Sequence, residues 1–566
     1  MPSPSDPSPK HHHHAAPIGD FTAGPRTIAI SLLALVVGVL AATIAKALLA
    51  LITFFTNLFF FQRFSLAAVT PASHHLGVLS VLVPVVGCLI IGILARYGSE
   101  KIRGHGIPEA LEAILIRGSR IEPRVALLKP ISSAISIGSG GPFGAEGPII
   151  MTGGAFGSMI AQLFHLTAAE RKTLLVAGAA AGMSATFASP VAAVLLAVEL
   201  LLFELKPRSL VPVALASAAA AVVRRYILGS GPLFPVPDVD IAAATAPMIL
   251  LSCSFVGLAA GALSAMLTAA VYAAEDAFAK LKLHWMWWPA LGGLVVGFGG
   301  LVCPQALGVG YDQIQALLLG GAGVAMTVRL MLVKATIWSV SLGSGTSGGV
   351  LAPLLMMGSA LGVLEAHFLP AHGSGFWPIV SMAAILAGTM RAPLTAMIFA
   401  IELSGRFGLA LPILTAGMVA HLFTVLVLRR SILTEKVARR GFHLTREYSI
   451  DPLEILFVRE VMLHEAVVLP LDSAAAAVAH GDEPLRAAVH RMAELGLTQL
   501  PVIDRSEPPQ LVGLVTLKEA LTARVRHLEE EGRRERVLPL RAMIPFPRFR
   551  GSGAAADKPK PDRKAV

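Results

Sequence analysis

Long apolar stretches separated by short polar connectors fill most of the chain between Thr27 and Leu428. Two of them, TIAISLLALVVGVLAATIAKALLALITFF and LGVLSVLVPVVGCLIIGIL, are long enough to cross a bilayer as helices. Many others are shorter or are cut by Gly and Pro. The pattern predicts an all-α polytopic membrane protein with about ten or more spans of uneven length.

The composition supports a membrane protein, with 55% hydrophobic residues, 14% charged residues and a mean hydropathy of +0.70. The formal net charge of +10 does not indicate nucleic-acid binding, because the basic residues are scattered over connectors and chain ends. That distribution is typical of positive-inside topology. It places RRSILTEKVARR (429–440), and with it the C-terminal end, in the cytoplasm. Three isolated cysteines, Cys88, Cys253 and Cys303, indicate packing rather than disulfide or metal chemistry.

Composition shifts mark the expected domains. The N-terminal end is rich in Pro and Ser, lacks a signal-peptide pattern and contains a His run at 11–14, which we interpret as part of a solvated cytoplasmic tail. From about Ser449 the sequence is typical of a soluble domain. The expected boundaries are a disordered tail over 1–26, a transmembrane domain over 27–445, a small α/β domain over 446–545 and a second disordered tail over 546–566.

The apolar region contains an internal repeat. Residues 138–157 align with residues 343–362, which lie 205 positions further on, with nine identities in twenty. SPVAAVLLAVEL and APLTAMIFAIEL follow in the same order and align Glu199 with Glu402. Two matches in sequence favour a duplicated transmembrane unit over chance glycine richness. The two repeats are expected at about 27–228 and 246–440.

The repeated glycine motifs suggest an anion site. Transporters built from repeats bind substrate near the bilayer midplane, where broken helices direct their positive N-terminal ends at an anion. Glycines let the backbone approach a ligand, and Pro148 and Pro353 suit the first turn of a helix. The alternative is that the glycines only allow close helix packing. One carboxylate, Glu146, lies within the first motif and is expensive at membrane depth unless it has a function or partners.

Five motifs stand in order along the apolar region. They are GHGIPEA (104–110), GAEGP (144–148), GVGYD (308–312), GGVLAP (348–353) and RAPLTAMIFAIEL (391–403). Together they resemble the CLC family of chloride channels and chloride/proton exchangers. The resemblance covers roughly residues 30–440 and implies a homodimer of inverted-repeat subunits with tilted, broken helices. Each subunit would enclose its own pathway for chloride or a similar monovalent anion, without a cofactor, and Glu146 would be the gating glutamate that competes with the anion.

The implied anion-binding positions depart from the family pattern in their side chains. His105 stands where the family usually has Ser, Leu351 replaces a usual Phe, and Leu433 falls on the expected Tyr. Backbone N–H groups can still bind an anion without these hydroxyls. We hypothesise that His105 makes anion affinity depend on pH, the alternative being a neutral ring bonded to nearby backbone. The full set of implied positions is His105, Gly106, Ile107, Gly147, Val350, Leu351 and Leu433.

The proton branch of the family is also altered. Exchangers often carry two adjacent acids where this chain has Glu199 followed by Leu200. The missing acid favours a passive chloride channel, with a chloride/proton antiporter as the alternative. Glu204 reads as a solvated charge at a helix end.

Two other classes fit less well. An intramembrane hydrolase would need a base or a metal set beside Ser139, and neither is visible, so we expect no enzyme. A cation transporter would need several acids at the duplicated site, yet Leu351 occupies the position equivalent to Glu146.

The soluble region resembles a CBS domain. Residues 480–521 predict helix, strand, turn, strand and helix, with PVID and LVGLVT as the strands. Thr516 and Glu519 match a ribose-binding pattern, but we favour a structural cap over adenine-nucleotide binding. FVREVMLHEAVVLP (457–470) is interpreted as the opening of another, incomplete copy. The whole chain is expected in a bacterial inner membrane, with both termini cytoplasmic.

Overall fold

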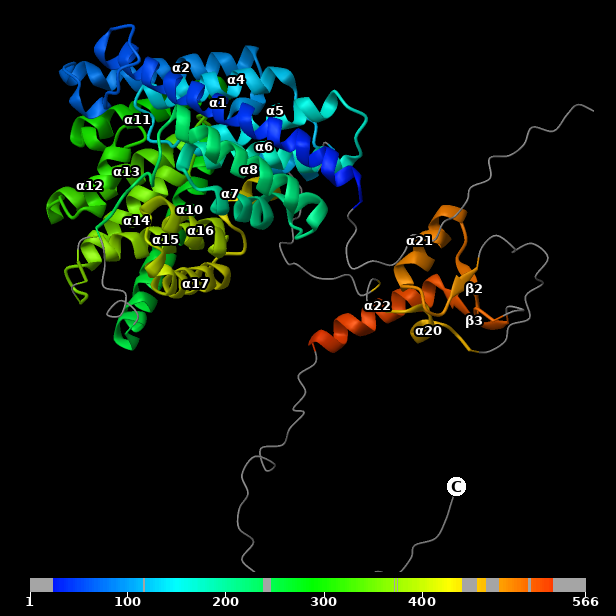
Figure 1. The fold of residues 1–566 in the computed structure, drawn as a ribbon. Helices are drawn as coiled ribbons and strands as arrows, with labels where there is room; N and C mark the ends of the chain where they lie inside the picture. Colours follow the sequence, from blue (N-terminus) through cyan, green and yellow to red (C-terminus); the bar gives the residue numbers. More distant parts are fainter. Residues whose placement is uncertain are drawn as a thin grey trace, which may run out of the picture. The chain divides into compact units, whose positions relative to one another are not determined.

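The structure, a computed structural model, describes residues 24–115, 118–237, 246–370, 372–373, 375–439, 453, 456–464, 478–506 and 510–532. Most of the expected N-terminal tail, with the His run, and the expected C-terminal tail lie outside these residues. The chain divides into two compact units, Met1–Arg446 and Glu447–Val566. The first is helical, and the second is a small α/β unit (Figure 1).

The first half of the helical unit begins with a long apolar helix. Prolines at the first turn and a capping box at Thr167 and Glu170 fix several helix starts. Helix α7 continues into the π-helical segment η4, so this element is short and irregular. The helices are α1 (Arg26–Phe61), α2 (Leu82–Tyr97), α3 (Ile107–Leu115), α4 (Pro123–Gly138), α5 (Glu146–Gln162), α6 (Ala168–Phe187), α7 (Pro190–Leu196), η4 (Ala197–Leu202) and α8 (Pro207–Ile227). Short 3-10 turns are η1 (Pro71–Ser73), η2 (Gly77–Val81) and η3 (Glu100–Ile102).

The second half repeats this order of long, short and broken helices. They are α10 (Pro247–Ala279), α11 (Trp288–Val302), α12 (Tyr311–Leu318), α13 (Val324–Gly343), α14 (Leu351–Glu365), α15 (Phe376–Met390), α16 (Pro393–Ser404), α17 (Ala410–Val427) and α18 (Ile432–Arg439). The 3-10 turns are η5 (Trp285–Trp287), η6 (Pro304–Ala306) and η7 (Phe407–Leu409).

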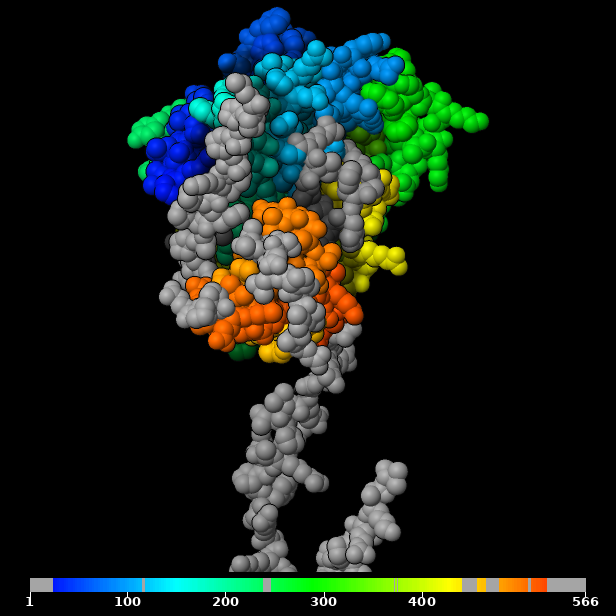
Figure 2. All heavy atoms as spheres, turned by 90° about the vertical axis from the view of Figure 1, so that its right-hand side faces the viewer, coloured from blue at the N-terminus to red at the C-terminus, as the bar shows by residue number. Residues whose placement is uncertain are grey.

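Helices pack in matching pairs in the two halves. In the first half α5 packs on α6, α6 on α8 and α1 on α8, and in the second α14 packs on α15, α15 on α17 and α10 on α17. Both halves reach the surface shown in Figure 2, the first coloured blue to cyan and the second green to yellow. The duplication in the sequence is therefore a duplication of packing.

Seven helices among the described residues are long and apolar enough to cross a membrane. Shorter apolar helices, α14, α15, α16 and the α7–η4 element, lie among them. The glycines inside α5 and α6 do allow close packing, because a Cβ on Gly153 or Gly178 would collide with the other's carbonyl oxygen. That reading explains the glycines within the helices, but not those in the loops that precede α5 and α14.

The C-terminal unit contains a three-stranded sheet in the order β1–β2–β3. The expected helix, strand, turn, strand and helix are confirmed as α21 (Leu485–Leu495), β2 (Gln499–Ile503), β3 (Leu511–Thr516) and α22 (Leu517–Gly532). β1 (Ala479–His480) pairs parallel with β2, and β2 pairs antiparallel with β3. Both α20 (Val458–Val461) and β1 were not predicted.

The interpretation of residues 457–470 as the opening of another copy is wrong for their described part, residues 457–464. The N–H of Val458 donates to Glu483 O, and Leu463 exchanges backbone hydrogen bonds of 2.8 and 3.0 Å with Leu514 on β3. This segment therefore belongs to the same small domain as the two predicted strands. Its contacts lie about 25 and 50 residues away in the chain, so no local pattern could reveal them.

Candidate functional site

Three short loops meet inside the helical unit, each directly before a helix. The first glycine loop (139–145) precedes α5, the second glycine loop (344–350) precedes α14, and the α3 turn (100–106) precedes α3. Gly144 and Gly349 exchange backbone hydrogen bonds of 3.4 and 3.0 Å, and Gly348 N–H donates to Gly104 O at 3.4 Å. The N-termini of three helices, whose first N–H groups have no partner within their own backbone turn, therefore converge on one place.

Glu146 is the first residue of α5 and is fully buried at this convergence. Its Oε1 accepts a 2.6 Å hydrogen bond from the N–H of Ala352, in the first turn of α14. Its Oε2 is also buried and has no hydrogen-bond partner among the described residues. The carboxylate of the first repeat thus accepts a hydrogen bond from the helix N-terminus of the second repeat, as a bound anion would.

Two repeat-related glycines make room for this carboxylate. A Cβ on Gly144 would overlap both carboxylate oxygens of Glu146, and a Cβ on Gly349 would lie 3.0 Å from the Glu146 Cδ. Gly147 is held equally closely, since a Cβ there would strike the carbonyl of His105 and lie 3.1 Å from Gly349 Cα. Glycine is needed at these positions for space, which explains the motif better than helix packing does.

The residues before α3 are brought to the same place. His105 and Ile107 are buried, and a Cβ on Gly106 would strike the carbonyl of Gly147. The N–H of Gly106 donates to Glu109 Oε2 at 2.8 Å, which closes the first turn of α3. Of the implied anion ligands, Gly106 therefore has its amide engaged by a protein carboxylate in this structure.

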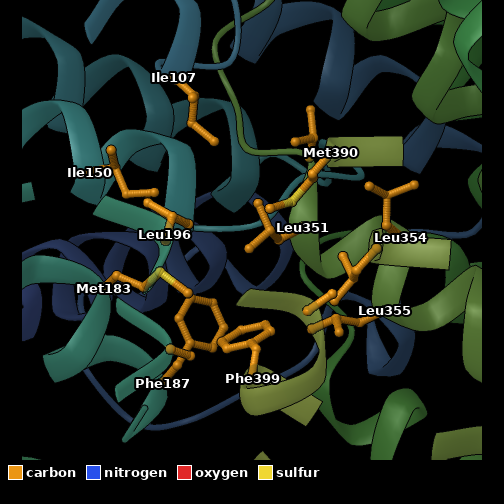
Figure 3. Packing of buried hydrophobic residues seen from close by; sticks show 14 of the residues in the cluster. Ile107, Ile150, Met183, Phe187, Leu196, Leu351, Leu354, Leu355, Met390 and Phe399 are labelled. Carbon is orange, nitrogen blue, oxygen red and sulfur yellow. The ribbon is translucent and has the colours of Figure 1, made fainter. Parts of the chain in front are cut away.

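The remaining implied anion positions carry apolar side chains. Val350 and Leu351 cap and begin α14, and both are fully buried. Figure 3 shows Leu351 within a cluster of buried apolar side chains that includes Leu196, Phe187 and Phe399. Leu433, near the start of α18, is buried as well. The side chains at these positions supply a nonpolar wall, and the hydrogen-bond donors come from the backbone.

Glu199 and Glu402 form a reciprocal pair. Glu199 Oε1 and Oε2 accept from the N–H groups of Leu394 and Thr395 at 3.3 and 2.8 Å, in the first turn of α16. Glu402 accepts from Val191 and Ala192 at 3.0 and 2.9 Å, in the first turn of α7. Each acid caps the helix that carries the other.

Leu200, at the position where exchangers often have an acid, is fully buried within the π-helical segment η4. Ser139, the candidate nucleophile of the hydrolase alternative, donates its hydroxyl to Ser136 O at 3.1 Å. Among the described residues, the hydrogen-bond partner of the Ser139 hydroxyl is this backbone carbonyl.

Two lysines that the sequence analysis did not single out approach the loops. Lys129 on α4 and Lys334 on α13 are fully buried, and each donates to two backbone carbonyls. They lie 205 positions apart, the same offset as the glycine motifs. Each of these helices contains one lysine, at the same place in the repeat, and this was the available signal.

A cavity of about 670 Å³ opens beside the α3 turn. Its walls carry both signs of charge, with Lys436 on α18 lying 3.5 Å from Glu109 Oε1. Arg439 pairs with Asp276 at 2.5 Å and with Glu435 at 3.2 Å. The cavity is therefore polar, and most of its cations are already matched by acids.

In the small domain, the pattern compared with a ribose site has a local role. Thr516 immediately precedes α22, its hydroxyl donates to Glu519, and the Glu519 N–H points back to Thr516 Oγ1 at 3.3 Å. This is a helix N-cap, which satisfies both side chains without a ligand.

Comparison with known proteins agrees with this geometry. A family model described as voltage gated chloride channel matches residues 86–425, and a CBS domain model matches residues 458–526. The chain belongs to the CLC family. As a CLC protein it is an anion transporter of the membrane, and the small domain is one CBS domain.

Two curated CLC relatives and one solved structure show the range of the family. A ClcB-like protein from Ralstonia nicotianae, named for chloride channels, is 30% identical over 60% of this chain and 81% of its own. The H(+)/Cl(-) exchange transporter ClcA of Yersinia pestis bv. Antiqua (strain Angola) is 30% identical over 61% of this chain and 73% of its own. The fold is similar to that of a slow cyanobacterial Cl-/H+ antiporter, with TM-score 0.63, 23% identity, and coverage of 74% and 99%.

Proposed function

We propose that this CLC protein moves chloride, or a similar monovalent anion, across the membrane in exchange for protons, with Glu146 as the gate. The observation that carries the proposal is the Glu146 carboxylate bonded to the Ala352 N–H at a convergence of three helix N-termini. A carboxylate in that place excludes an anion from the same donors. Protonation removes its charge and lets a permeant anion displace it.

This arrangement links anions to protons through one side chain. An anion passes only after Glu146 has taken up a proton, and the proton has to leave again before the carboxylate can return. The fully buried surroundings of Glu146 favour such a switch, because a dry site penalises a charge that has lost its donors. Coupled exchange follows if the proton leaves on the opposite side of the membrane from its entry.

The sequence favoured passive conduction because of Leu200, whereas the relatives named as H(+)/Cl(-) exchange transporters favour coupled exchange. Both carboxylate oxygens of Glu199 accept hydrogen bonds from the first turn of α16, so this residue is not poised to accept a proton. Glu199 therefore favours neither exchange nor passive conduction. A passive channel is the second candidate, and the specific observation in its favour is the buried Leu200.

A vesicle experiment separates the two candidates. Purified protein is reconstituted in liposomes with an outward chloride gradient, and external chloride and pH are followed together. Exchange predicts that chloride efflux drives protons inward, and that a proton ionophore collapses the resulting pH difference. Chloride efflux without proton uptake would establish the channel, and no efflux of any halide would refute anion transport.

We further propose that His105 makes anion affinity depend on pH. His105 is buried, and its main-chain carbonyl lies against Gly147 at the convergence. A positive charge on its ring would attract an anion bound there. Replacing His105 with Ser restores the usual family residue, and the pH profile of anion flux should flatten. An unchanged profile would reduce His105 to a packing residue.

Several broader expectations remain proposals. The protein would work as a homodimer in a bacterial inner membrane, with both termini in the cytoplasm and one anion pathway in each subunit. The CBS domain would have a structural role rather than bind a nucleotide. The hydrogen bond between Thr516 and Glu519 supports this, because it satisfies both side chains without a ligand. Chemical cross-linking in native membranes tests the dimer, and isothermal titration of the full chain with ATP tests the structural role against nucleotide binding.

A further inference from the structure

The buried lysines Lys129 and Lys334 have no part in the gate mechanism as described so far. A lysine at membrane depth is costly, and it persists only when it is paired with acceptors or serves a function. Both lysines are completely buried, in apolar helices at matching positions of the two repeats. Because such a costly residue occurs at the same position of both repeats, we infer that the pair has a role.

Each lysine binds the same part of its own repeat. Lys129 Nζ donates to Ile102 O at 2.8 Å and to Gly104 O at 2.7 Å, in the α3 turn. In the second repeat the equivalent segment is the α12 turn (304–310), which runs through η6 to the start of α12. There Lys334 Nζ donates to Ala306 O at 2.9 Å and to Gly308 O at 2.8 Å.

Each of these turns is in turn bonded to a glycine loop of the other repeat. Gly104 O, which Lys129 holds, also accepts from the N–H of Gly348 in the second glycine loop at 3.4 Å. Gly308, whose carbonyl Lys334 holds, donates its N–H to Gly140 O in the first glycine loop at 3.1 Å. The lysine of one repeat thus supports the loop that begins the anion-facing helix of the other.

The charges around the two lysines differ. Lys334 interacts electrostatically with Asp312 on α12, with Cys303 and with Glu146 on α5. Lys129 interacts instead with Glu109 on α3 and Lys436 on α18. Tyr311 on α12 also interacts electrostatically with Glu146. Of the two lysines, Lys334 is therefore the one that acts on the gate carboxylate through its charge.

We propose that Lys129 and Lys334 are positioning residues that fix the glycine loops across the repeat boundary, and that Lys334 also biases Glu146 toward its ionised, blocking form. This inference rests on the proposed gate role of Glu146. Lys129 sets the placement of the backbone donors before α14. Lys334 sets the placement of the loop before α5 and, through its positive charge, the pH at which the gate opens.

The test uses each lysine as the control for the other. Lys334→Met and Lys129→Met are reconstituted in liposomes, and chloride flux is measured against pH together with the thiocyanate-to-chloride flux ratio. Loss of the positive charge near Glu146 should raise the pH of half-maximal flux in Lys334→Met by about one unit. Lys129→Met should keep the wild-type midpoint. It should change the flux ratio by roughly threefold, because the backbone donors before α14 would be displaced.

Three further variants keep the test decisive. Lys334→Arg retains the charge and should retain the wild-type midpoint. If Lys334→Met does not fold, Lys334→Gln, which is neutral but still donates hydrogen bonds, should show the same raised midpoint. Lys334→Met combined with Glu146→Gln should have the pH profile of Glu146→Gln alone, because the charge acts through the carboxylate.

The outcomes are distinct. Proportional loss of flux in both Met variants, with unchanged midpoint and unchanged flux ratio, would overturn the inference and leave the lysines as structural caps. Glu146→Gln with a wild-type pH profile would instead refute the gate itself, and the Lys334 charge effect with it. A raised midpoint in Lys334→Met that is absent from Lys129→Met supports the assignment.

Discussion

Glu146 and Leu351 occupy the same position in the two transmembrane repeats, as the first residues of α5 and α14. In the first repeat the side chain is a carboxylate that reaches a backbone donor of the second. In the second repeat it is a leucine packed in an apolar cluster (Figure 3). The same helix start therefore carries the gate in one half and a nonpolar wall in the other.

Other equivalent positions have stayed alike. Lys129 matches Lys334 in its two carbonyl partners, and Glu199 matches Glu402 in the backbone amides that it accepts from. All four residues bind main-chain groups, so their shared effect is on backbone placement, to which Lys334 adds the proposed effect of its charge on the gate. The comparison teaches that the symmetric residues build the scaffold, while the asymmetric ones carry the function, as expected for a site between two related halves.

Breaking the asymmetry at the gate should have the largest effect. Glu146→Gln keeps the size of the side chain but cannot ionise, so it no longer blocks the donors and no longer carries a proton. We expect chloride flux to lose the part of its pH dependence that comes from Glu146, and proton flux to fall by at least about tenfold. Parallel chloride and pH recordings on liposomes measure both.

The matched control for this variant lies in the second repeat. Leu351→Met changes the equivalent apolar residue without charge and should leave the coupling ratio and pH dependence at wild-type values. Loss of proton coupling in Leu351→Met, or its survival in Glu146→Gln, would contradict the division between gate and wall.

A smaller effect is expected at the glycines beside the gate, Gly144 and Gly349. The atoms nearest to a Cβ on Gly144 belong to the Glu146 carboxylate, which can move, so Gly144→Ala should displace the gate and keep the fold. A Cβ on Gly349 lies 2.7 Å from the backbone oxygen of Gly144, which cannot move easily. Gly349→Ala should therefore destabilise the site by about 1–3 kcal/mol.

The measurements for this pair are chloride flux at neutral pH and thermal unfolding. Gly144→Ala should raise flux roughly two- to tenfold, since it weakens a hydrogen bond of the closed gate. Gly349→Ala should lower the melting temperature and the flux together. Equal behaviour of the two variants would mean that both glycines serve only packing.

Sequence alone predicted the parts of this site that repeat along the chain. The offset of the glycine motifs placed Gly144 over Gly349 and Glu146 over Leu351, and helix N-termini with glycine loops predicted backbone donors. The same offset joined Lys129 to Lys334, but isolated lysines in apolar helices gave no motif. Their role depends on carbonyls 25 to 28 residues away, which only the folded turns reveal.

Sequence alone also could not predict the reciprocal contacts between the repeats. The alignment paired Glu199 with Glu402 as equivalents, yet it could not show that each caps the helix of the other, because that contact spans more than 190 residues. The interpretation of the segment that opens the CBS domain was wrong for the same reason. Residues 457–464 look like a separate opening until their pairing with β3 is known.

The smallest effect is expected at Glu199 and Glu402, where the halves are most alike. Replacing either with Gln exchanges a charged acceptor for a neutral one at a helix N-terminus, which should cost about 1–2 kcal/mol of stability. Thermal unfolding should show similar losses for both variants, with the chloride-to-proton ratio unchanged. Glu199 adjoins the position of the missing exchanger acid, so a coupling change in Glu199→Gln alone would mean that this carboxylate handles protons. The symmetry of the two caps would then conceal a second functional difference between the repeats.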